Sequence, residues 1–329
     1  MSDEDLASRA PESDAQEDAQ TKSGIPGDTK PDQGAASMGE HCTNDRPTPA
    51  YLGTPTGEIT KFNDTDVYIT KPADYPHTSA KLLLLLTGGT GIHSKNNQLQ
   101  ADKYAGEGFL VVMPDQFAND PAPATSTSTA PANANPSMIE QVKLAVATTA
   151  KSFSIDMWLA RHTPEKVLPI LHRVLTSVKE EFADAAGNGV YAVGYCFGAK
   201  YVLLLGSKLH MDVAQGQRAP ESQAEEGMMK QGTQIKAGAI AHGTLIAKED
   251  LAGVRVPMCV VAVEDDPMFP DNVREEGVKA LQEKGVEHEV SVYAGVPHGF
   301  AVLGDYEDEK IVEQQGKAYE QMLGWLKSH

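Results

Sequence analysis

Strongly apolar runs bounded by turn-forming residues recur from about residue 58 to the end of the chain, and helix-like segments separate them. Buried strands of a parallel sheet have such continuous apolar runs, because helices cover both faces of the sheet. The predicted strands are 81–86, 109–113, 189–193, 235–241, 256–263 and 288–293. The predicted helices are 97–107, 164–185, 198–209, 271–284 and 308–327. This alternation predicts an α/β fold with a mainly parallel central sheet flanked by helices.

Two segments interrupt the alternation. Residues 120–137 are rich in Pro, Ala, Ser and Thr, and residues 211–232 are polar and rich in Gly, Gln and Glu. Neither has the apolar periodicity of a packed helix or strand. We predict that both are insertions at the surface.

Negative charge is concentrated at the N-terminus. The 329 residues carry 28 basic and 46 acidic side chains, a net charge of −18. Residues 1–40 hold ten acidic against three basic side chains, a net charge of −7, and almost no large apolar residue. Such a segment cannot bury enough apolar surface to offset its loss of conformational entropy. We therefore predict a disordered acidic tail over 1–40 and one folded domain over 41–329.

Composition also limits the expected partners and compartment. A nucleic-acid surface needs clustered Lys and Arg, and the chain has no dense basic run, so no nucleic-acid partner is expected. The longest apolar run, 82–86, is far shorter than the roughly 20 residues that span a bilayer. The N-terminus also lacks the basic and apolar blocks of a secretory signal. We expect a cytoplasmic protein with reduced cysteines and no membrane partner.

The three cysteines are too few and too widely spaced for a disulfide scaffold or a cysteine zinc site. No grouping of His, Asp and Glu has metal-ligand spacing, so neither a metal nor another cofactor is expected. Cys259 lies inside a predicted strand and is expected to pack in the core. Cys42 follows the tail, and two roles stay open for it: lining a site or capping the domain.

Cys196 occupies a different setting, a Gly-x-Cys-x-Gly turn between a predicted strand and a predicted helix. Glycines two residues on either side of a nucleophile let the backbone turn sharply, as in a nucleophile elbow. The turn also places the thiol at a helix N-terminus, where the helix dipole favours the thiolate. The alternative is a buried structural cysteine in a tight turn, and the motif alone does not separate the two.

Two further groups follow at positions where they can join this cysteine. The predicted strand 256–263 ends in a run of three acidic residues, the last of which is Asp266. The predicted strand 288–293 leads into a loop that carries His298 between a proline and a glycine. Nucleophile, acid and histidine in this chain order are typical of α/β-hydrolases.

These pieces resemble the dienelactone hydrolase family of α/β-hydrolases. The resemblance covers residues 40–329 in order and spacing. It is carried by Gly-Tyr-Cys-Phe-Gly at 194–198, Asp-Pro-Met-Phe-Pro at 266–270, Pro-His-Gly-Phe at 297–300 and the upstream segment 106–115.

The resemblance implies an α/β-hydrolase fold and a Cys-Asp-His triad. Cys196 would be the nucleophile, His298 the base and Asp266 the acid that orients the histidine. Asp266 is preferred to Asp265 because the acid of the family lies four residues before a proline, here Pro270.

A triad of this kind needs backbone donors for the oxyanion that forms on the substrate. The amide of Phe197, directly after the nucleophile, is one of them. The second comes from the loop after an early strand, here 87–91, and we select Gly89. A dinucleotide fingerprint in this loop is disfavoured, because its glycines do not follow Gly-x-Gly-x-x-Gly.

The chain departs from the family pattern at positions that contact the substrate. Family members that act on dienelactone carry an acidic residue in the early loop, where this chain has Gly88. They hold the substrate carboxylate with two arginines, where this chain has Gln116, Phe117 and Ala118 in one region and Val302 in the other. The resemblance therefore supports hydrolase chemistry more strongly than the substrate that gives the family its name.

Three further residues are predicted substrate contacts. His242 ends a predicted strand at the sheet edge of the triad, and His93 follows the glycine-rich loop. Trp158, together with Met157, precedes the long helix and could roof a pocket. The alternatives are loop histidines with structural hydrogen bonds and burial of the other two side chains in the core.

We therefore expect a cysteine-dependent hydrolase of a small-molecule ester, lactone or thioester. It is similar to fungal members of the family, some of which serve secondary metabolite pathways. One alternative is a non-hydrolytic ligand-binding or biosynthetic accessory protein on the same fold, suggested by Gly88 and by the missing arginines. Another is acyl transfer or thioesterase action by the same triad. The sequence leaves the oligomeric state open.

Overall fold

The computed structural model describes residues 43–124, 154–208 and 233–329, which belong to one compact unit. The predicted tail 1–40, Cys42, segment 211–232 and most of segment 120–137 lie outside the described residues. Within the described ranges, no helix is both long and apolar enough to cross a membrane.

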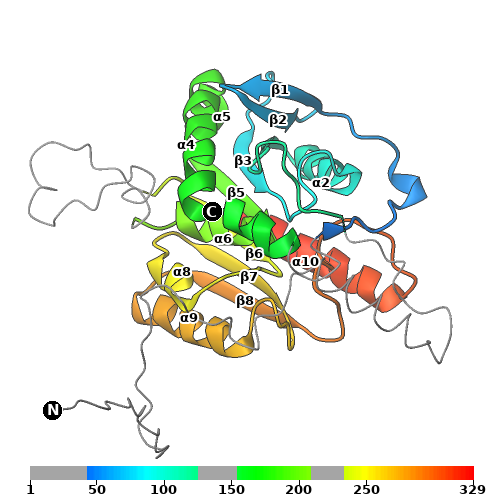
Figure 1. Ribbon diagram of the computed structural model, residues 1–329. Helices are drawn as coiled ribbons and strands as arrows, with labels where there is room; N and C mark the ends of the chain where they lie inside the picture. Colours follow the sequence, from blue (N-terminus) through cyan, green and yellow to red (C-terminus); the bar gives the residue numbers. More distant parts are fainter. Residues whose placement is uncertain (1–42, 125–153, 209–232) are drawn as a thin grey trace, which may run out of the picture. The chain divides into compact units, whose positions relative to one another are not determined.

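An eight-stranded sheet forms the centre of the unit (Figure 1). Its strands are β1 (Glu58–Phe62), β2 (Thr65–Thr70), β3 (Lys81–Leu86), β4 (Phe109–Pro114), β5 (Val190–Tyr195), β6 (Ala237–Ala241), β7 (Met258–Val263) and β8 (His288–Tyr293). They lie in the order β1-β2-β4-β3-β5-β6-β7-β8. β2 is antiparallel to both of its neighbours, and the pairs from β4 to β8 are parallel. The predicted mainly parallel α/β sheet is confirmed.

Helices cover both faces of the sheet. They are α2 (Lys95–Gly106), α4 (Pro164–Glu181), α5 (Ala183–Ala186), α6 (Phe197–Leu205), α8 (Lys248–Gly253), α9 (Asp271–Glu283) and α10 (Glu309–Ser328), with a short 3₁₀ helix, η1 (Ala50–Leu52), before the sheet. Successive residues of β3 point to opposite faces. Leu84 packs in the cluster that contains residues of α4, α6, α8 and α9, whereas Leu85 packs in the cluster that contains residues of α2 and α10. The continuous apolar runs therefore reflect burial on both faces.

Four elements differ from the predictions. Strands β1 and β2 were not predicted, because β1 lies at the sheet edge with partly exposed side chains and has no continuous apolar run. The short helix α8 was not predicted either. The predicted helix 164–185 is interrupted at Phe182, where the backbone leaves the helical region (φ −114°, ψ 49°) and the ring packs 6.3 Å from that of Phe62.

The topology brings four loops together. Since β5, β6, β7 and β8 are neighbouring parallel strands, the loops that follow them emerge at the same edge of the sheet. These loops carry Cys196, Thr244, Asp266 and His298, respectively. Residues up to 102 positions apart in the chain therefore meet at one edge.

Candidate active site

Cys196 occupies a strained turn between β5 and α6. Its backbone has φ 50° and ψ −115°, a conformation that costs a non-glycine residue about 1–3 kcal/mol and persists only where the surroundings impose it. Here the backbone amide of Cys196 donates to the carbonyl of Ala241 at 3.1 Å, and its carbonyl accepts from the amide of Thr244 at 3.1 Å. The amide of Gly198 donates to the carbonyl of Thr87 at 3.0 Å. Neighbouring strand ends thus hold the turn.

The glycines that flank Cys196 are required by the close approach of other backbone segments. A Cβ atom on Gly194 would lie 2.7 Å from the carbonyl oxygen of Gly198. A Cβ atom on Gly198 would overlap the carbonyl group of Leu86 in β3. The spacing of the Gly-x-Cys-x-Gly motif therefore matches the sterics of a nucleophile elbow.

Asp266 and His298 form a close pair beside this turn. The Oδ2 atom of Asp266 lies 2.7 Å from Nδ1 of His298, and its Oδ1 atom accepts from the amide of Met268 at 2.9 Å. Asp266 is 3% exposed, whereas the adjacent Asp265 is exposed. An ionised carboxylate accepts from Nδ1–H, which leaves Nε2 as the proton-exchanging atom of the imidazole.

Thr244 contacts both the histidine and the cysteine. Its Oγ1 atom is 3.3 Å from Nε2 of His298 and 3.2 Å from Sγ of Cys196, and the residue is fully buried. A hydroxyl donates one hydrogen bond and accepts others, so it can accept from Nε2–H while donating to a thiolate. Sequence reasoning missed Thr244. The one sequence feature that could have indicated it is its position in the loop after a central parallel strand, two residues beyond His242.

The environment of His298 favours its charged form. Burial lowers the pKa of His298, but hydrogen bonds and negative charge from Asp266 and Cys196 outweigh the burial and raise the pKa to about 9. An imidazolium next to a cysteine in turn favours the thiolate. A charged His298 beside Cys196 is the arrangement that a thiolate–imidazolium pair would need.

The glycine-rich loop that follows β3 lies against Cys196. A Cβ atom on Gly88 would lie 3.2 Å from Cβ and 3.7 Å from Sγ of Cys196. Phe197 is the first residue of α6, so its amide is among those that have no acceptor within the helix. Gly89 follows in the same loop, and its carbonyl accepts from the amide of Ala122 at 2.8 Å. Gly89 and Phe197 stay the predicted pair of oxyanion donors.

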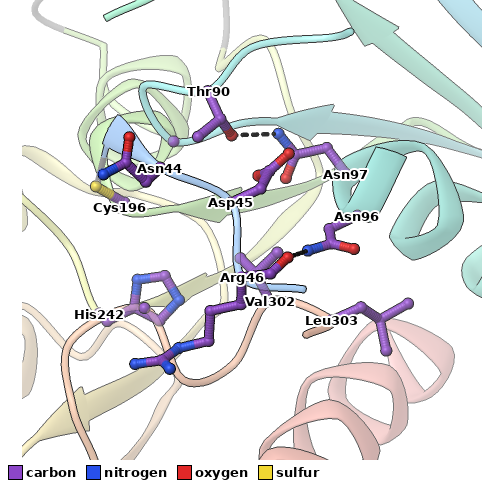
Figure 2. A pocket seen from close by; sticks show the side chains of 12 residues that line it. Asn44, Asp45, Arg46, Thr90, Asn96, Asn97, Cys196, His242, Val302 and Leu303 are labelled. Atoms are coloured by element: carbon purple, nitrogen blue, oxygen red, sulfur yellow. Dashed lines mark hydrogen bonds between the residues drawn. The ribbon is translucent and has the colours of Figure 1, made fainter. Parts of the chain in front are cut away.

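Cys196 lines a small pocket whose walls are both polar and apolar (Figure 2). Val302 lines it, and so does His242, whose ring centroid lies 5.0 Å from that of His298. His242 is thus brought to the site as predicted from its position after β6. His93 is exposed and is not one of the pocket-lining residues, so the structure does not bring it to the site.

Trp158 lies in the core and does not roof the pocket. It is fully buried, and its indole N–H donates to the carbonyl of Asp120 at 2.7 Å. Its ring centroid is 5.0 Å from those of both Phe117 and Phe197. The prediction of a substrate contact is wrong because this aromatic cluster encloses the indole. Met157, the preceding residue, is 45% exposed.

Sequence reasoning also missed part of the pocket wall. Asn44, Asp45 and Arg46, which precede the first strand, line the pocket together with Thr90, Asn96 and Asn97 of the loop after β3 and of α2. These three N-terminal residues belong to no motif and no periodic element. No signal in the sequence places them near Cys196.

The remaining described cysteine has a structural role. Cys259 in β7 is fully buried in the hydrophobic core, as predicted, and burial raises the pKa of its thiol. Among the residues that the structure describes, no group of three or more His, Cys, Asp or Glu is placed to hold a metal ion.

The bridging role of Thr244 gives a testable expectation. Thr244→Val removes the hydroxyl and keeps the branched shape. A hydrogen bond to a charged group contributes roughly 1.5–3 kcal/mol, which corresponds to about one to two pKa units. We expect the pH midpoint for alkylation of Cys196 by iodoacetamide to rise by about that amount and kcat for ester hydrolysis to fall about 10-fold. Thr244→Ser keeps the hydroxyl and should behave as wild type; an unchanged midpoint in the valine variant would exclude the bridge.

The fold and the site together define an α/β-hydrolase: a mainly parallel sheet, an elbow after β5, and an acid and a histidine after later strands. The family model described as "Dienelactone hydrolase family" matches residues 65–217 and 226–329. The chain belongs to the dienelactone hydrolase family, and it is a hydrolase that acts on ester bonds.

Known proteins agree with this assignment. The chain is 28% identical to hydrolase pyvD of Aspergillus violaceofuscus, over 85% of this chain and 93% of that protein. It is also 28% identical to hydrolase tropI of Talaromyces stipitatus, over 85% of this chain and 92% of that protein. A solved structure titled as a putative dienelactone hydrolase from Klebsiella pneumoniae superposes with a TM-score of 0.55 at 15% identity, over 83% of this chain and 99% of that one, which supports the fold.

Proposed function

We propose that the chain hydrolyses a small-molecule ester, lactone or thioester through a Cys196-Asp266-His298 triad. The observation that carries the proposal is the continuous polar contact at the sheet edge. Asp266 lies 2.7 Å from Nδ1 of His298, and Thr244 connects Nε2 of that histidine to Sγ of Cys196. Nucleophile, base and orienting acid are the three roles that acyl transfer through a covalent intermediate requires.

The reaction begins when the Cys196 thiolate attacks the carbonyl carbon of the substrate, forming a C–S bond. The carbonyl oxygen becomes an oxyanion, which the amides of Phe197 and Gly89 are proposed to stabilise. As the tetrahedral intermediate collapses, the ester C–O bond breaks and the leaving oxygen takes the proton from Nε2 of His298. The product is a thioester on Cys196 and a neutral imidazole.

Hydrolysis of the thioester completes the cycle. Neutral His298 takes a proton from water as the water oxygen attacks the thioester carbonyl, and the C–S bond then breaks. This step releases the acid and restores the thiolate and the imidazolium. Asp266 keeps the imidazole in one tautomer and stabilises its charged form throughout.

The biological setting stays a proposal. We propose a role in a fungal secondary metabolite pathway, and the similarity to hydrolases pyvD and tropI, which come from two fungi, supports the fungal part of this proposal. We also propose a cytoplasmic location and a small-molecule substrate.

Detection of the thioester tests the proposal directly. Wild-type protein is mixed with 4-nitrophenyl butyrate, quenched in acid within milliseconds to seconds, and analysed by mass spectrometry after digestion. We expect one butyryl group on the peptide that contains Cys196 and none in Cys196→Ala. Slow Cys196 alkylation together with the absence of both ester cleavage and acylation would favour the non-hydrolytic ligand-binding alternative.

A further inference from the structure

The N-terminal segment 43–48 borders the pocket that contains Cys196 (Figure 2). This segment lies outside the family match, which begins at residue 65. It supplies the two charged residues among those that line the pocket, Asp45 and Arg46. Residues upstream of the matched region therefore supply both of these charges.

Hydrogen bonds on both sides hold the segment in place. The side chain of Asn96 in α2 donates to the carbonyl of Arg46 at 2.8 Å and accepts from Oγ1 of Thr48 at 2.8 Å. From the loop before α10, the amide of Asp305 donates to the carbonyl of Pro47 at 2.8 Å. The backbone of the segment is therefore anchored to two separate parts of the domain.

The guanidinium of Arg46 is oriented by an aromatic ring. Its Cζ atom lies 4.1 Å from the ring centroid of Tyr306. Figure 2 shows the side chain extending beside His242, with Val302 nearby on the same wall. A guanidinium stacked on an aromatic face keeps its donors in its own plane, a geometry that suits two-point recognition of a carboxylate.

The carboxylate of Asp45, the residue before Arg46, forms its hydrogen bond at the start of α2. Oδ1 of Asp45 accepts a hydrogen bond from Oγ of Ser94 at 2.8 Å, at the start of α2. The chain as a whole carries a net charge of −18, which repels anions over long range. A local cation offsets this repulsion, and Arg46 is the Lys or Arg residue among the described residues that line the pocket.

We propose that Arg46 is a specificity-determining residue that binds a carboxylate of the substrate while Cys196 attacks the ester or lactone carbonyl. This inference rests on the proposed function. It narrows the substrate class to esters and lactones that carry a carboxylate within reach of the scissile bond.

A matched pair of substrates tests the inference. 4-Nitrophenyl hemiglutarate carries a terminal carboxylate, and the corresponding glutaramate carries a neutral primary amide of the same length. In Arg46→Gln we expect the ratio of kcat/KM for the anionic over the neutral ester to fall about 10- to 100-fold, as for loss of one charge-assisted hydrogen-bonding group. Arg46→Lys should give an intermediate ratio because it keeps the charge and loses the planar fork.

Lys317→Gln is the charge-matched control, because Lys317 forms an exposed ion pair with Glu313 within α10. Its ratio of kcat/KM for the anionic over the neutral ester should equal that of wild type. A ratio within about twofold of wild type in Arg46→Gln, with both esters still hydrolysed, overturns the inference and leaves the proposed function standing. Since the ratio compares two substrates of one variant, a general loss of folded protein does not change it.

Binding of glutarate separates the two proposals. By calorimetry, Arg46→Gln is expected to bind glutarate about 10- to 100-fold more weakly than wild type and Lys317→Gln. This result supports the inference even if wild type hydrolyses no ester, in which case the proposed function alone fails. Equal affinity in all three proteins overturns the inference.

Discussion

Cys196→Ala is expected to lower kcat for hydrolysis of 4-nitrophenyl butyrate by at least about 10⁴-fold, because the acyl group then has no covalent acceptor. The residues of a triad act as a unit. In comparable enzymes, loss of the nucleophile removes all of the rate acceleration except the part that substrate binding and the oxyanion donors supply. Release of 4-nitrophenol at saturating substrate gives kcat. Equal rates in wild type and variant would refute nucleophilic catalysis by this thiol.

Cys259→Ala provides the control for loss of a thiol. Its side chain is buried in β7, on the face of the sheet that packs against α2 and α10. The variant is expected to lose stability through a small cavity and to keep kcat within about twofold. A comparable loss of kcat in both cysteine variants would indicate that the Cys196 effect is structural.

Asp266→Asn should lower kcat by about 10³- to 10⁴-fold while leaving the fold intact. An amide can present a donor to Nδ1 of His298 where the carboxylate accepts, which stabilises the wrong tautomer. The variant also removes a hydrogen bond and a negative charge that raise the pKa of His298 to about 9. Cys196 alone then opposes the effect of burial, so the pKa of His298 should fall by about one to three units.

Two measurements check this expectation. The pKa of His298 is followed by NMR titration of its imidazole protons, and the alkylation rate of Cys196 is followed as a function of pH. The alkylation profile should move to higher pH, because a neutral imidazole no longer stabilises the thiolate. Asp265→Asn is the matched control, since this neighbour is exposed and Asp266 forms the contact with His298. If kcat fell further in Asp265→Asn than in Asp266→Asn, Asp265 and not Asp266 would be the acid that orients His298.

Much of the fold followed from local patterns. Strands β3 to β7 are buried on both faces, so their apolar runs are visible without knowledge of their neighbours. The edge strand β1 escaped prediction because it has few buried positions. Strand β2 is mostly buried, but its sequence has no long apolar run. The helix predicted over 164–185 is interrupted at Phe182, whose ring packs against Phe62. The apolar periodicity of the helix contains no information about this tertiary contact.

Parts of the site were visible because they are consequences of backbone geometry. The glycines around Cys196 are needed by the sharp turn itself, and the chain order of Asp266 and His298 follows from the order of strands in the sheet. Trp158 was misassigned because an aromatic residue before a helix looks the same in sequence whether it faces a pocket or the core. Its burial depends on Phe117 and Phe197, which are distant in the chain.

The sequence by itself determined the α/β class, the strand-to-helix turn at Cys196 and the order of the groups that follow, because periodicity and glycine sterics act over a few residues. Only the tertiary structure decided that Thr244 bridges His298 and Cys196 and that Arg46 reaches the same pocket. Those arrangements depend on contacts between segments 48 or more residues apart. Such contacts form only when the loops at the sheet edge pack together, so no local sequence pattern predicts them.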